Sequence, residues 1–171
     1  MLKRLYPKEY HPSVLNINYD KLYSQGIKNI IFDIDNTLVT FNVLTPTEEI
    51  SNLFAALKKC GFSICILSNN NEKRVGDFST PLDVKFIHKA GKPGTKGALK
   101  ALKLLSADPK NTAIIGDQIF TDTWCGNQLG LYTILVEPVS RTQDELITKV
   151  KRGVEAFVVR QYLKGLAKIK M

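Results

Sequence analysis

The sequence IKNIIFDIDNT, residues 27–37, bears most directly on the fold of this chain. Residues 27–32 are mostly β-branched or aromatic, which predicts a buried β-strand. Two carboxylates separated by one residue, Asp33 and Asp35, follow where this strand ends. If the backbone stays extended there, the two side chains point to opposite sides of the chain. Each can then take a different chemical role.

Four further apolar runs of strand length follow, at residues 62–67, 84–87, 112–115 and 132–136. Segments with a helical spacing of apolar residues separate them, at about 45–60, 72–78, 96–105 and 122–128. We expect the first of these helices to have its cap at Thr45, Pro46 in its first turn and a capping box closed by Glu48. Strands that alternate with helices are typical of a parallel sheet covered on both faces. The sequence therefore predicts an α/β protein with a three-layer, Rossmann-like fold and a mainly parallel sheet.

The composition is that of an ordinary folded domain, with 44% hydrophobic and 23% charged residues, and this excludes a disordered chain. No apolar run approaches the ~18 residues that a membrane-spanning helix needs, and we expect no secretory signal. The cysteines Cys60, Cys65 and Cys125 lack the spacing of a disulfide framework or a zinc site, so we expect reduced core residues. These features favour a single cytoplasmic domain spanning residues 1–171.

The formal net charge of +8 is concentrated near the end of the sequence. From residue 149 onward, one acid, Glu155, is outnumbered by seven basic residues: Lys149, Lys151, Arg152, Arg160, Lys164, Lys168 and Lys170. They belong to a basic tail, residues 143–171, that we expect to be helical. Such a tail could meet an anionic phosphoester, a membrane surface or nucleic acid. Two alternatives stay open: a solvated helix face, or a helix whose apolar side packs on the sheet.

Polar side chains follow three of the predicted strands, at Asp33, Ser68 and Asp117. In open parallel sheets, ligands bind beyond the carboxyl ends of the strands. At such a place Asp33 could attack phosphorus while its other oxygen binds a metal ion. Asp35 could donate a proton to the leaving oxygen and later take one from water. The acidic pair alone is weak evidence, because acidic turns are common.

The residues downstream strengthen this interpretation. Ser68 offers a hydroxyl to a phosphate oxygen, and Lys92 offers a positive charge to the phosphate and to the attacking carboxylate. Asp117 supplies another oxygen ligand, with Asp122 five residues later. Phosphoryl transfer depends mostly on positioning and charge stabilisation, and Mg²⁺ shares its coordination between carboxylates, water and phosphate. The sequence therefore predicts a magnesium-dependent phosphoryl-transfer site.

In the order of the chain, the sequence resembles the haloacid dehalogenase (HAD) superfamily in four motifs: Asp33-x-Asp35-x-Thr37, Ser68-Asn69, Lys92-Pro93 and Gly116-Asp117-x-x-x-x-Asp122. The resemblance implies Asp33 as nucleophile and Asp35 as general acid and base, and the acid at Asp35 points to phosphatases. It implies that Ser68 and Lys92 bind phosphate and that Asn69 shapes the phosphate loop through its backbone amide. It further implies Mg²⁺ held by Asp33, Asp117 and the main-chain carbonyl of Asp35, with Asp122 in support.

The intervals between the motifs also bear on the substrate. They hold too little chain for a cap domain, so we expect an open site that accepts a bulky substrate or one presented at a surface. Residues 68–74, 89–93 and 116–122 look like subfamily IIIA proteins of YqeG type, which are related to mitochondrial phosphatidylglycerophosphate phosphatases. This resemblance implies a phosphomonoester on an anionic lipid head group. A peripheral location at the inner membrane face, through the basic tail, would follow.

Two other hypotheses remain. One keeps the chemistry but takes a soluble phosphosugar, a nucleotide or a nucleic-acid end as substrate. The other is a protein that binds RNA or the ribosome and has a vestigial site. Nucleic acid is the less favoured partner, because the sequence shows no aromatic stacking motif of the RNA-binding kind. Within the site, Arg74 is expected either to reach a phosphate or head group or to lie on the surface.

Overall fold

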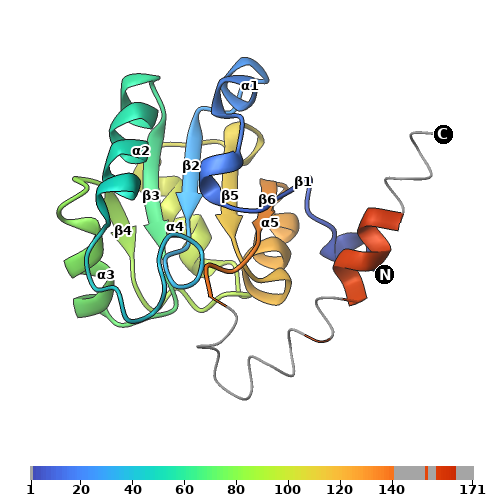
Figure 1. Cartoon of the computed structure of the whole chain (residues 1–171). Coiled ribbons are helices and arrows are strands. Elements are labelled where there is room, and N and C mark those ends of the chain that lie inside the picture. The colour runs from blue at the N-terminus through green and yellow to red at the C-terminus, as the bar shows by residue number, and fades with distance from the viewer. Residues whose placement is uncertain (1, 141–152, 154–156, 165–171) are drawn as a thin grey trace.

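The computed structural model describes residues 2–140, 153 and 157–164, and it is built around one parallel sheet (Figure 1). In space the strands follow the order β1-β6-β5-β2-β3-β4, and every pair of neighbours is parallel. The strands are β1 (Glu9–His11), β2 (Asn29–Phe32), β3 (Ser63–Leu67), β4 (Lys85–Ile87), β5 (Thr112–Gly116) and β6 (Tyr132–Val136). The predicted α/β, Rossmann-like fold is confirmed.

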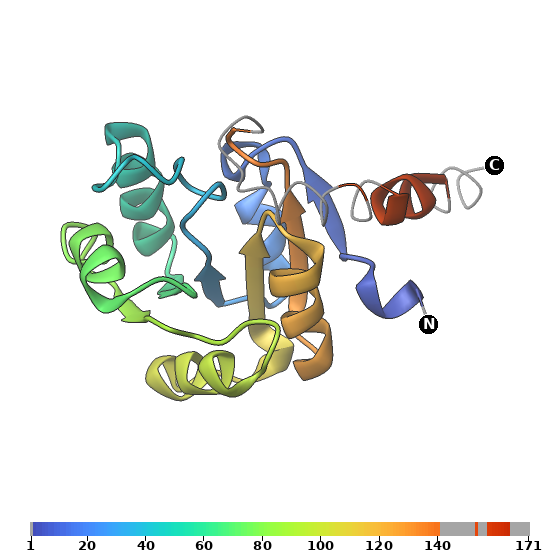
Figure 2. The ribbon, with the colours of Figure 1, turned by 90° about the horizontal axis from the view of Figure 1, so that it is seen from below.

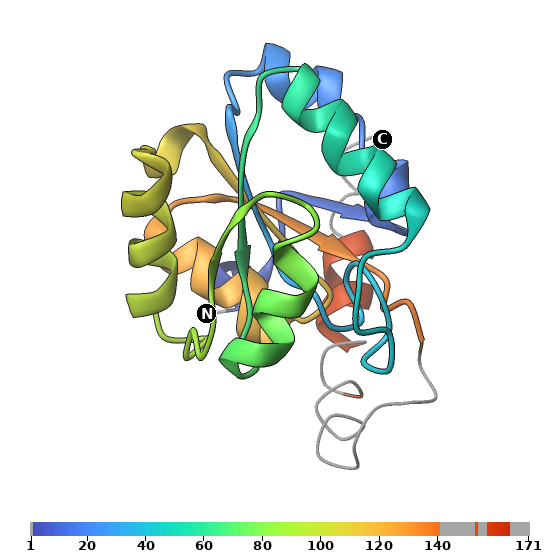
Figure 3. The same cartoon turned by 90° about the vertical axis from the view of Figure 1, so that its left-hand side faces the viewer.

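Helices cover both faces of the sheet, as Figure 3 shows for α2 and α4. The α-helices are α1 (Tyr19–Ser24), α2 (Glu48–Lys59), α3 (Glu72–Ser79), α4 (Lys96–Leu105) and α5 (Trp124–Leu129). Short helical turns are η1 (Leu2–Leu5), η2 (Val14–Asn16), η3 (Pro109–Asn111) and the π-helical turn η4 (Ile119–Thr123). On one face, Leu22, Phe54 and Phe78 bring α1, α2 and α3 into one core cluster. On the other, Ala101 and Cys125 bury α4 and α5.

The chain changes direction in the sheet at the central strand, β2. It runs from β2 outward through β3 to β4, then crosses back to β5 on the other side of β2. A crevice forms beyond the carboxyl ends of the strands at such a switch point. Figure 2 views the molecule from the edge toward which β2, β3 and β5 point in Figure 1. The polar strand ends therefore converge on this edge.

The segments between the motifs are short, as predicted. From residue 33 to residue 92, a stretch described throughout, the helices and strands are only α2, β3, α3 and β4. No cap domain covers the edge of the sheet in this part of the chain. No helix among the described residues is long and apolar enough to cross a membrane.

The structure corrects the predicted start of α2. The helix begins at Glu48, and its cap is Thr47, whose hydroxyl accepts a hydrogen bond from the Ile50 amide at 3.3 Å. Thr45 lies in a bend ahead of the helix, and the two residues between it and Glu48 are not helical. The predicted cap at Thr45 is therefore two residues too early, and Glu48 opens the helix instead of closing a capping box.

Two other expectations also change. Cys65 and Cys125 are buried as expected, but Cys60 is exposed, because it terminates α2 at the surface. β1 forms one edge of the sheet and pairs with β6, although no strand is predicted before residue 27. The short, half-buried sequence Glu9–His11 lacks the apolar run that marks the central strands.

Of the basic tail, the structure describes Gly153 and a helix over residues 157–164. Val158 and Tyr162 are buried, and Val158 packs in a small cluster with Ile119 and Leu135. The Tyr162 ring also meets Tyr6 edge-on, with ring centroids 5.6 Å apart. Here the apolar side of the tail does pack on the domain. The rest of the predicted helical segment lies outside the described residues.

Candidate active site

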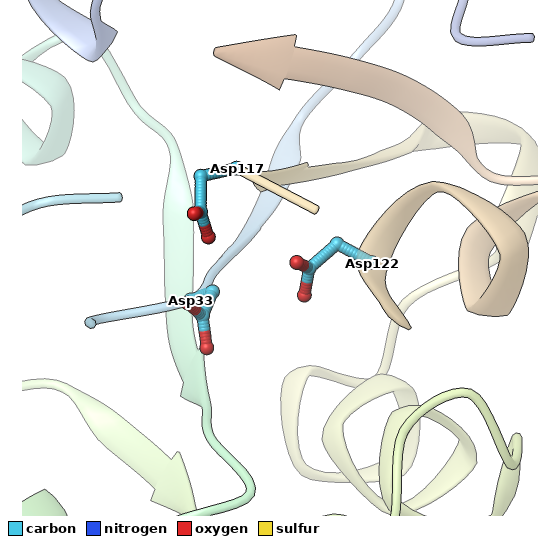
Figure 4. A group of neighbouring side chains, drawn as sticks. All are labelled: Asp33, Asp117 and Asp122. Carbon is cyan, nitrogen blue, oxygen red and sulfur yellow. The ribbon is translucent and has the colours of Figure 1, made fainter. Parts of the chain in front are cut away.

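Three buried carboxylates converge at the carboxyl ends of β2 and β5 (Figure 4). Asp33 follows β2, Asp117 follows β5, and Asp122 projects from η4. One oxygen from each lies within 4.8 Å of the others. Asp33 and Asp117 lie close together because β2 and β5 are paired. Phe32 is opposite Ile115, and the Asp33 amide donates to the Ile115 carbonyl at 3.0 Å.

Asp122 reaches this cluster because η4 is wound as a π-helical turn. The Asp122 and Thr123 amides both donate to the Gln118 carbonyl, at 3.0 and 3.3 Å. The turn places the Asp122 carboxylate directly against Gly116, where any β-carbon would collide with it. Glycine at position 116 is thus required by the approach of Asp122, which gives the first residue of the GDxxxxD motif a steric reason.

Thr37 and Lys92 connect these carboxylates. The Thr37 hydroxyl lies 3.1 Å from Asp33 Oδ2 and 3.2 Å from Asp117 Oδ1, and its one hydrogen can be donated to either. Lys92 Nζ donates to Asp33 Oδ1 at 2.7 Å and to Asp122 Oδ1 at 2.5 Å. The site is therefore a single connected network.

Burial and charge act in opposite directions on the ionisation of this network. Burial raises the pKa of Asp33 to about 6; the Lys92 charge opposes this rise and the Asp122 charge adds to it. Burial alone would lower the pKa of Lys92, but Asp122 and Asp33 raise it above its usual range. Lys92 is thus a permanent cation beside a carboxylate that is costly to ionise.

The charges in the network fit a divalent cation. Three buried carboxyl groups share this site with one ammonium group, so acidic groups outnumber basic ones among these four. Buried charge of this kind needs a partner, and hard divalent cations prefer carboxylate oxygens. Asp33, Asp117 and Asp122 are therefore the residues that could hold a metal ion.

The loops after β3 and β4 position Lys92 and Ser68. The Asn69 side chain makes two hydrogen bonds to the backbone of Lys92: it accepts from the amide at 2.8 Å and donates to the carbonyl at 3.0 Å. The buried Ser68 hydroxyl accepts from the Asn70 amide at 3.1 Å. The side chain of Asn69 is thus used to fix Lys92. Only the backbone amide of Asn69 is left for the phosphate contact inferred from the sequence.

Asp35 lies apart from the carboxylate cluster. Its carboxylate pairs with Arg74, whose Nη2 donates at 2.8 Å. Arg74 is therefore neither a surface residue nor a free phosphate ligand: its side chain is only 7% exposed. The sequence placed Arg74 in the first turn of a helix near the site, but no spacing rule connects it to Asp35, 39 residues earlier.

A cavity of about 450 Å³ lies beside the segment that follows Asp35. Val14, Val39, Val43 and Ile50 contribute to its mostly apolar lining. Thr37 also lines it, so one residue is shared between this cavity and the carboxylate network.

Comparison with known proteins agrees with this geometry. A HAD-hydrolase-like family model matches residues 89–161. The chain is 40% identical to the probable phosphatase YqeG of Bacillus subtilis (strain 168) over 156 residues, which cover 91% of this chain and 90% of that protein.

Two more distant likenesses extend this result. The chain is 28% identical to phosphatidylglycerophosphate phosphatase 1, chloroplastic/mitochondrial, of Arabidopsis thaliana, over 91% of this chain but only 49% of that protein. Among solved structures, NagD from E. coli K-12 aligns with a TM-score of 0.55 and 17% identity, over 67% of this chain and 89% of that one. The structural likeness supports the fold.

Proposed function

This chain belongs to the HAD superfamily and is a HAD-type phosphatase, and from that premise we propose that Asp33 is the nucleophile of a magnesium-dependent phosphomonoester hydrolase. The observation that carries this proposal is the position of Asp33, buried at the end of the central strand between Lys92 and two further carboxylates. Lys92 keeps one Asp33 oxygen oriented, and its charge can neutralise an incoming phosphoryl group.

The proposed metal ligands are Asp33, Asp117 and the main-chain carbonyl of Asp35, with Asp122 in support. The excess of carboxyl groups over cations in the network favours a divalent cation here, and Mg²⁺ suits an all-oxygen site. When bound, the ion would add positive charge next to the phosphate oxygens. Ser68, the Asn69 amide and Lys92 would hold those oxygens from the other side.

In the first half of the proposed reaction, a carboxylate oxygen of Asp33 attacks phosphorus. The bond from phosphorus to the substrate's ester oxygen breaks, and Asp35 gives its proton to that oxygen. In the second half, Asp35 takes a proton from water as the water oxygen attacks the phosphoryl group. Asp33 is released as a carboxylate, inorganic phosphate leaves, and Asp35 is protonated again.

For the substrate, we propose the phosphomonoester of phosphatidylglycerophosphate, presented at the cytoplasmic face of a membrane. Three observations support it: the similarity to the phosphatidylglycerophosphate phosphatase of Arabidopsis thaliana, the uncapped edge of the sheet, and the basic sequence of the tail. An uncapped site leaves room for a head group that stays attached to a bilayer. Basic residues outside the site would favour an anionic surface.

The test is phosphate release from phosphatidylglycerophosphate in mixed micelles, measured beside glycerol 3-phosphate, a sugar phosphate and a nucleotide. We expect activity that requires Mg²⁺ and a kcat/KM for the lipid at least roughly 10-fold above the soluble esters, because remote binding energy contributes to turnover. If only the soluble esters are cleaved, the proposed lipid substrate is wrong and the substrate is a soluble phosphomonoester. Unchanged turnover by Asp33→Asn would contradict the mechanism itself.

A further inference from the structure

The two oxygens of the Asp35 carboxylate have different surroundings. Oδ1 accepts two hydrogen bonds from Arg74, from Nη2 at 2.8 Å and from Nε at 3.3 Å. Oδ2 accepts one, from Asn70 Nδ2 at 3.3 Å. The amide of Asn70 is oriented by its own oxygen, which accepts from the Asn71 backbone at 2.8 Å. One carboxylate oxygen is thus firmly held, and the other is held by a single long contact.

Arg74 is itself fixed from three directions. Its Nη1 donates to the Leu44 carbonyl at 2.9 Å, and its guanidinium lies 5.5 Å from the centre of the Phe78 ring. Its backbone amide is capped by Asn71, the first residue before α3. A buried arginine held at both ends of its fork can orient a partner carboxylate with little loss of side-chain entropy.

The charge of Asp35 reaches the catalytic network. Asp35 is one of the groups that raise the pKa of Asp33, after burial and the charge of Asp122. The side chain of Asp35 is 23% exposed, against 7% for Arg74. The carboxylate of Asp35 therefore keeps more contact with solvent than the guanidinium that holds it.

We propose that Arg74 is a positioning residue that makes Oδ2 of Asp35 the atom which transfers the proton. A guanidinium only donates hydrogen bonds. A hydrogen on Oδ1 would point at two N–H groups and find no acceptor there, so the proton of the acid form resides on Oδ2. The proposal rests on the role of Asp35 proposed above, and it adds the residue that orients this acid.

In the step concerned, the Oδ2–H bond of Asp35 breaks as the ester oxygen leaves phosphorus and takes that hydrogen. Asp33 forms the new bond to phosphorus, so the products are a free alcohol, the phosphorylated Asp33 and the Asp35 carboxylate. An alkoxide needs this proton far more than a nitrophenolate does, because the nitrophenolate is already a stable anion. Misplacement of the acid should therefore harm alkyl esters selectively.

The test compares Arg74→Met with the wild type on two soluble substrates, glycerol 3-phosphate and 4-nitrophenyl phosphate, at saturating Mg²⁺. We expect kcat for the alkyl ester to fall by on the order of 10²-fold, and kcat for the aryl ester by less than about 3-fold. Arg74→Lys keeps a charge but replaces the planar fork of nitrogens by a single nitrogen, so its loss on the alkyl ester should lie between those of the wild type and Arg74→Met. Lys73→Met is the matched control, since Lys73 lies next to Arg74 on α3 with its side chain 84% exposed, and both substrates should be unaffected.

Equal losses on both substrates would overturn the proposal and leave Arg74 a structural anchor for Leu44. No loss on either would overturn it as well. The Asp35→Asn variant distinguishes the acid role of Asp35 from the positioning role of Arg74. If Asp35→Asn shows no selective loss on the alkyl ester, the acid role of Asp35 fails too. If Asp35→Asn shows the selective loss and Arg74→Met does not, only the role of Arg74 fails. When Arg74→Met is combined with Asp35→Asn, it should add no further loss on the alkyl ester relative to the aryl ester. This expectation holds even if Arg74→Met alone makes the protein less stable.

Discussion

At the scale of single residues, the site is governed by ionisable groups that share a buried space. Asp33, Asp117 and Asp122 lie together, and Lys92 is the cation that pairs with Asp33 and Asp122. The result is a pKa of about 6 for Asp33, raised chiefly by burial. A nucleophilic carboxylate must be ionised, so the metal-free protein holds it in an unfavourable state at neutral pH, and a bound divalent cation would relieve this cost.

This arrangement predicts a pH-dependent stability of the metal-free protein. Between an unfolded pKa of 3.8 and a folded pKa of about 6, the folded protein retains a proton that the unfolded chain has lost. Raising the pH through this window should lower the free energy of unfolding, by on the order of 3 kcal/mol from this group. Urea unfolding in the presence of EDTA measures it. Mg²⁺ favours the ionised form, so its stabilising effect should be greater at about pH 7.5 than at about pH 5.

The control for this measurement is Asp33→Asn, which cannot ionise at position 33. Its stability in EDTA should decline less over the same window, and its response to Mg²⁺ should be weaker. If wild type and Asp33→Asn follow the same pH dependence, Asp33 does not carry the raised pKa.

The sequence located most of these residues, for a simple physical reason. Asp33, Ser68 and Asp117 each follow an apolar run, and parallel strands bring their carboxyl ends to one edge. The contact of Arg74 with Asp35 escaped prediction because it joins α3 to the loop after β2, 39 residues apart in sequence. The Asn69 side chain escaped as well, since its partners are backbone groups of Lys92.

At the scale of elements, the predicted strands and helices match where apolar periodicity is strong, as in α4, whose predicted bounds are those of the structure. The predicted bounds are wrong at the ends of some helices, where a single hydrogen bond determines at which residue the helix begins. Thr45 and Thr47 both resemble caps in the sequence, and the hydrogen bond from the Ile50 amide to the Thr47 hydroxyl identifies the second as the cap. The helix predicted at about 122–128 begins inside the π-helical turn η4, because a wider turn leaves no pattern in the sequence.

Removal of the cap hydroxyls tests the corrected start of α2. Thr47→Ala should lower the free energy of unfolding by about 1 kcal/mol, because the Ile50 amide loses its acceptor. Thr45→Ala, the matched variant, should change it by less than about 0.5 kcal/mol. Urea unfolding of both proteins distinguishes the two threonines, and a greater loss in Thr45→Ala would restore the cap predicted from the sequence.

At the scale of the whole molecule, the described part of the tail packs beside the site. Val158 contacts the cluster of Ile119 and Leu135, and Ile119 opens the turn that carries Asp122. The apolar pattern of the tail left this packing open as one of two alternatives, but it could not name the partners, which lie far apart in sequence. The pairing of β1 with β6 is equally distant in sequence, and no local pattern predicts it. The tail thus contributes to the domain over residues 157–164, and its contact with lipid remains a proposal for its basic residues.

Two neighbouring substitutions test this packing. Val158→Ala should lower the free energy of unfolding by about 1–3 kcal/mol, because it leaves a cavity against Ile119 and Leu135. Phe157→Ala should have an effect below about 0.5 kcal/mol, since Phe157 is 54% exposed. Thermal or urea unfolding measures both, and equal effects would contradict the packing of this helix.

The central claim is that the phosphoryl group passes through Asp33. The most direct measurement is to quench the enzyme rapidly during turnover with Mg²⁺, reduce any acyl-phosphate with borohydride, and locate the altered residue by peptide mass spectrometry. We predict a modification at Asp33 that requires both Mg²⁺ and substrate and is absent from Asp33→Asn. Modification of another residue, or phosphate release by Asp33→Asn at the wild-type rate, would contradict the account.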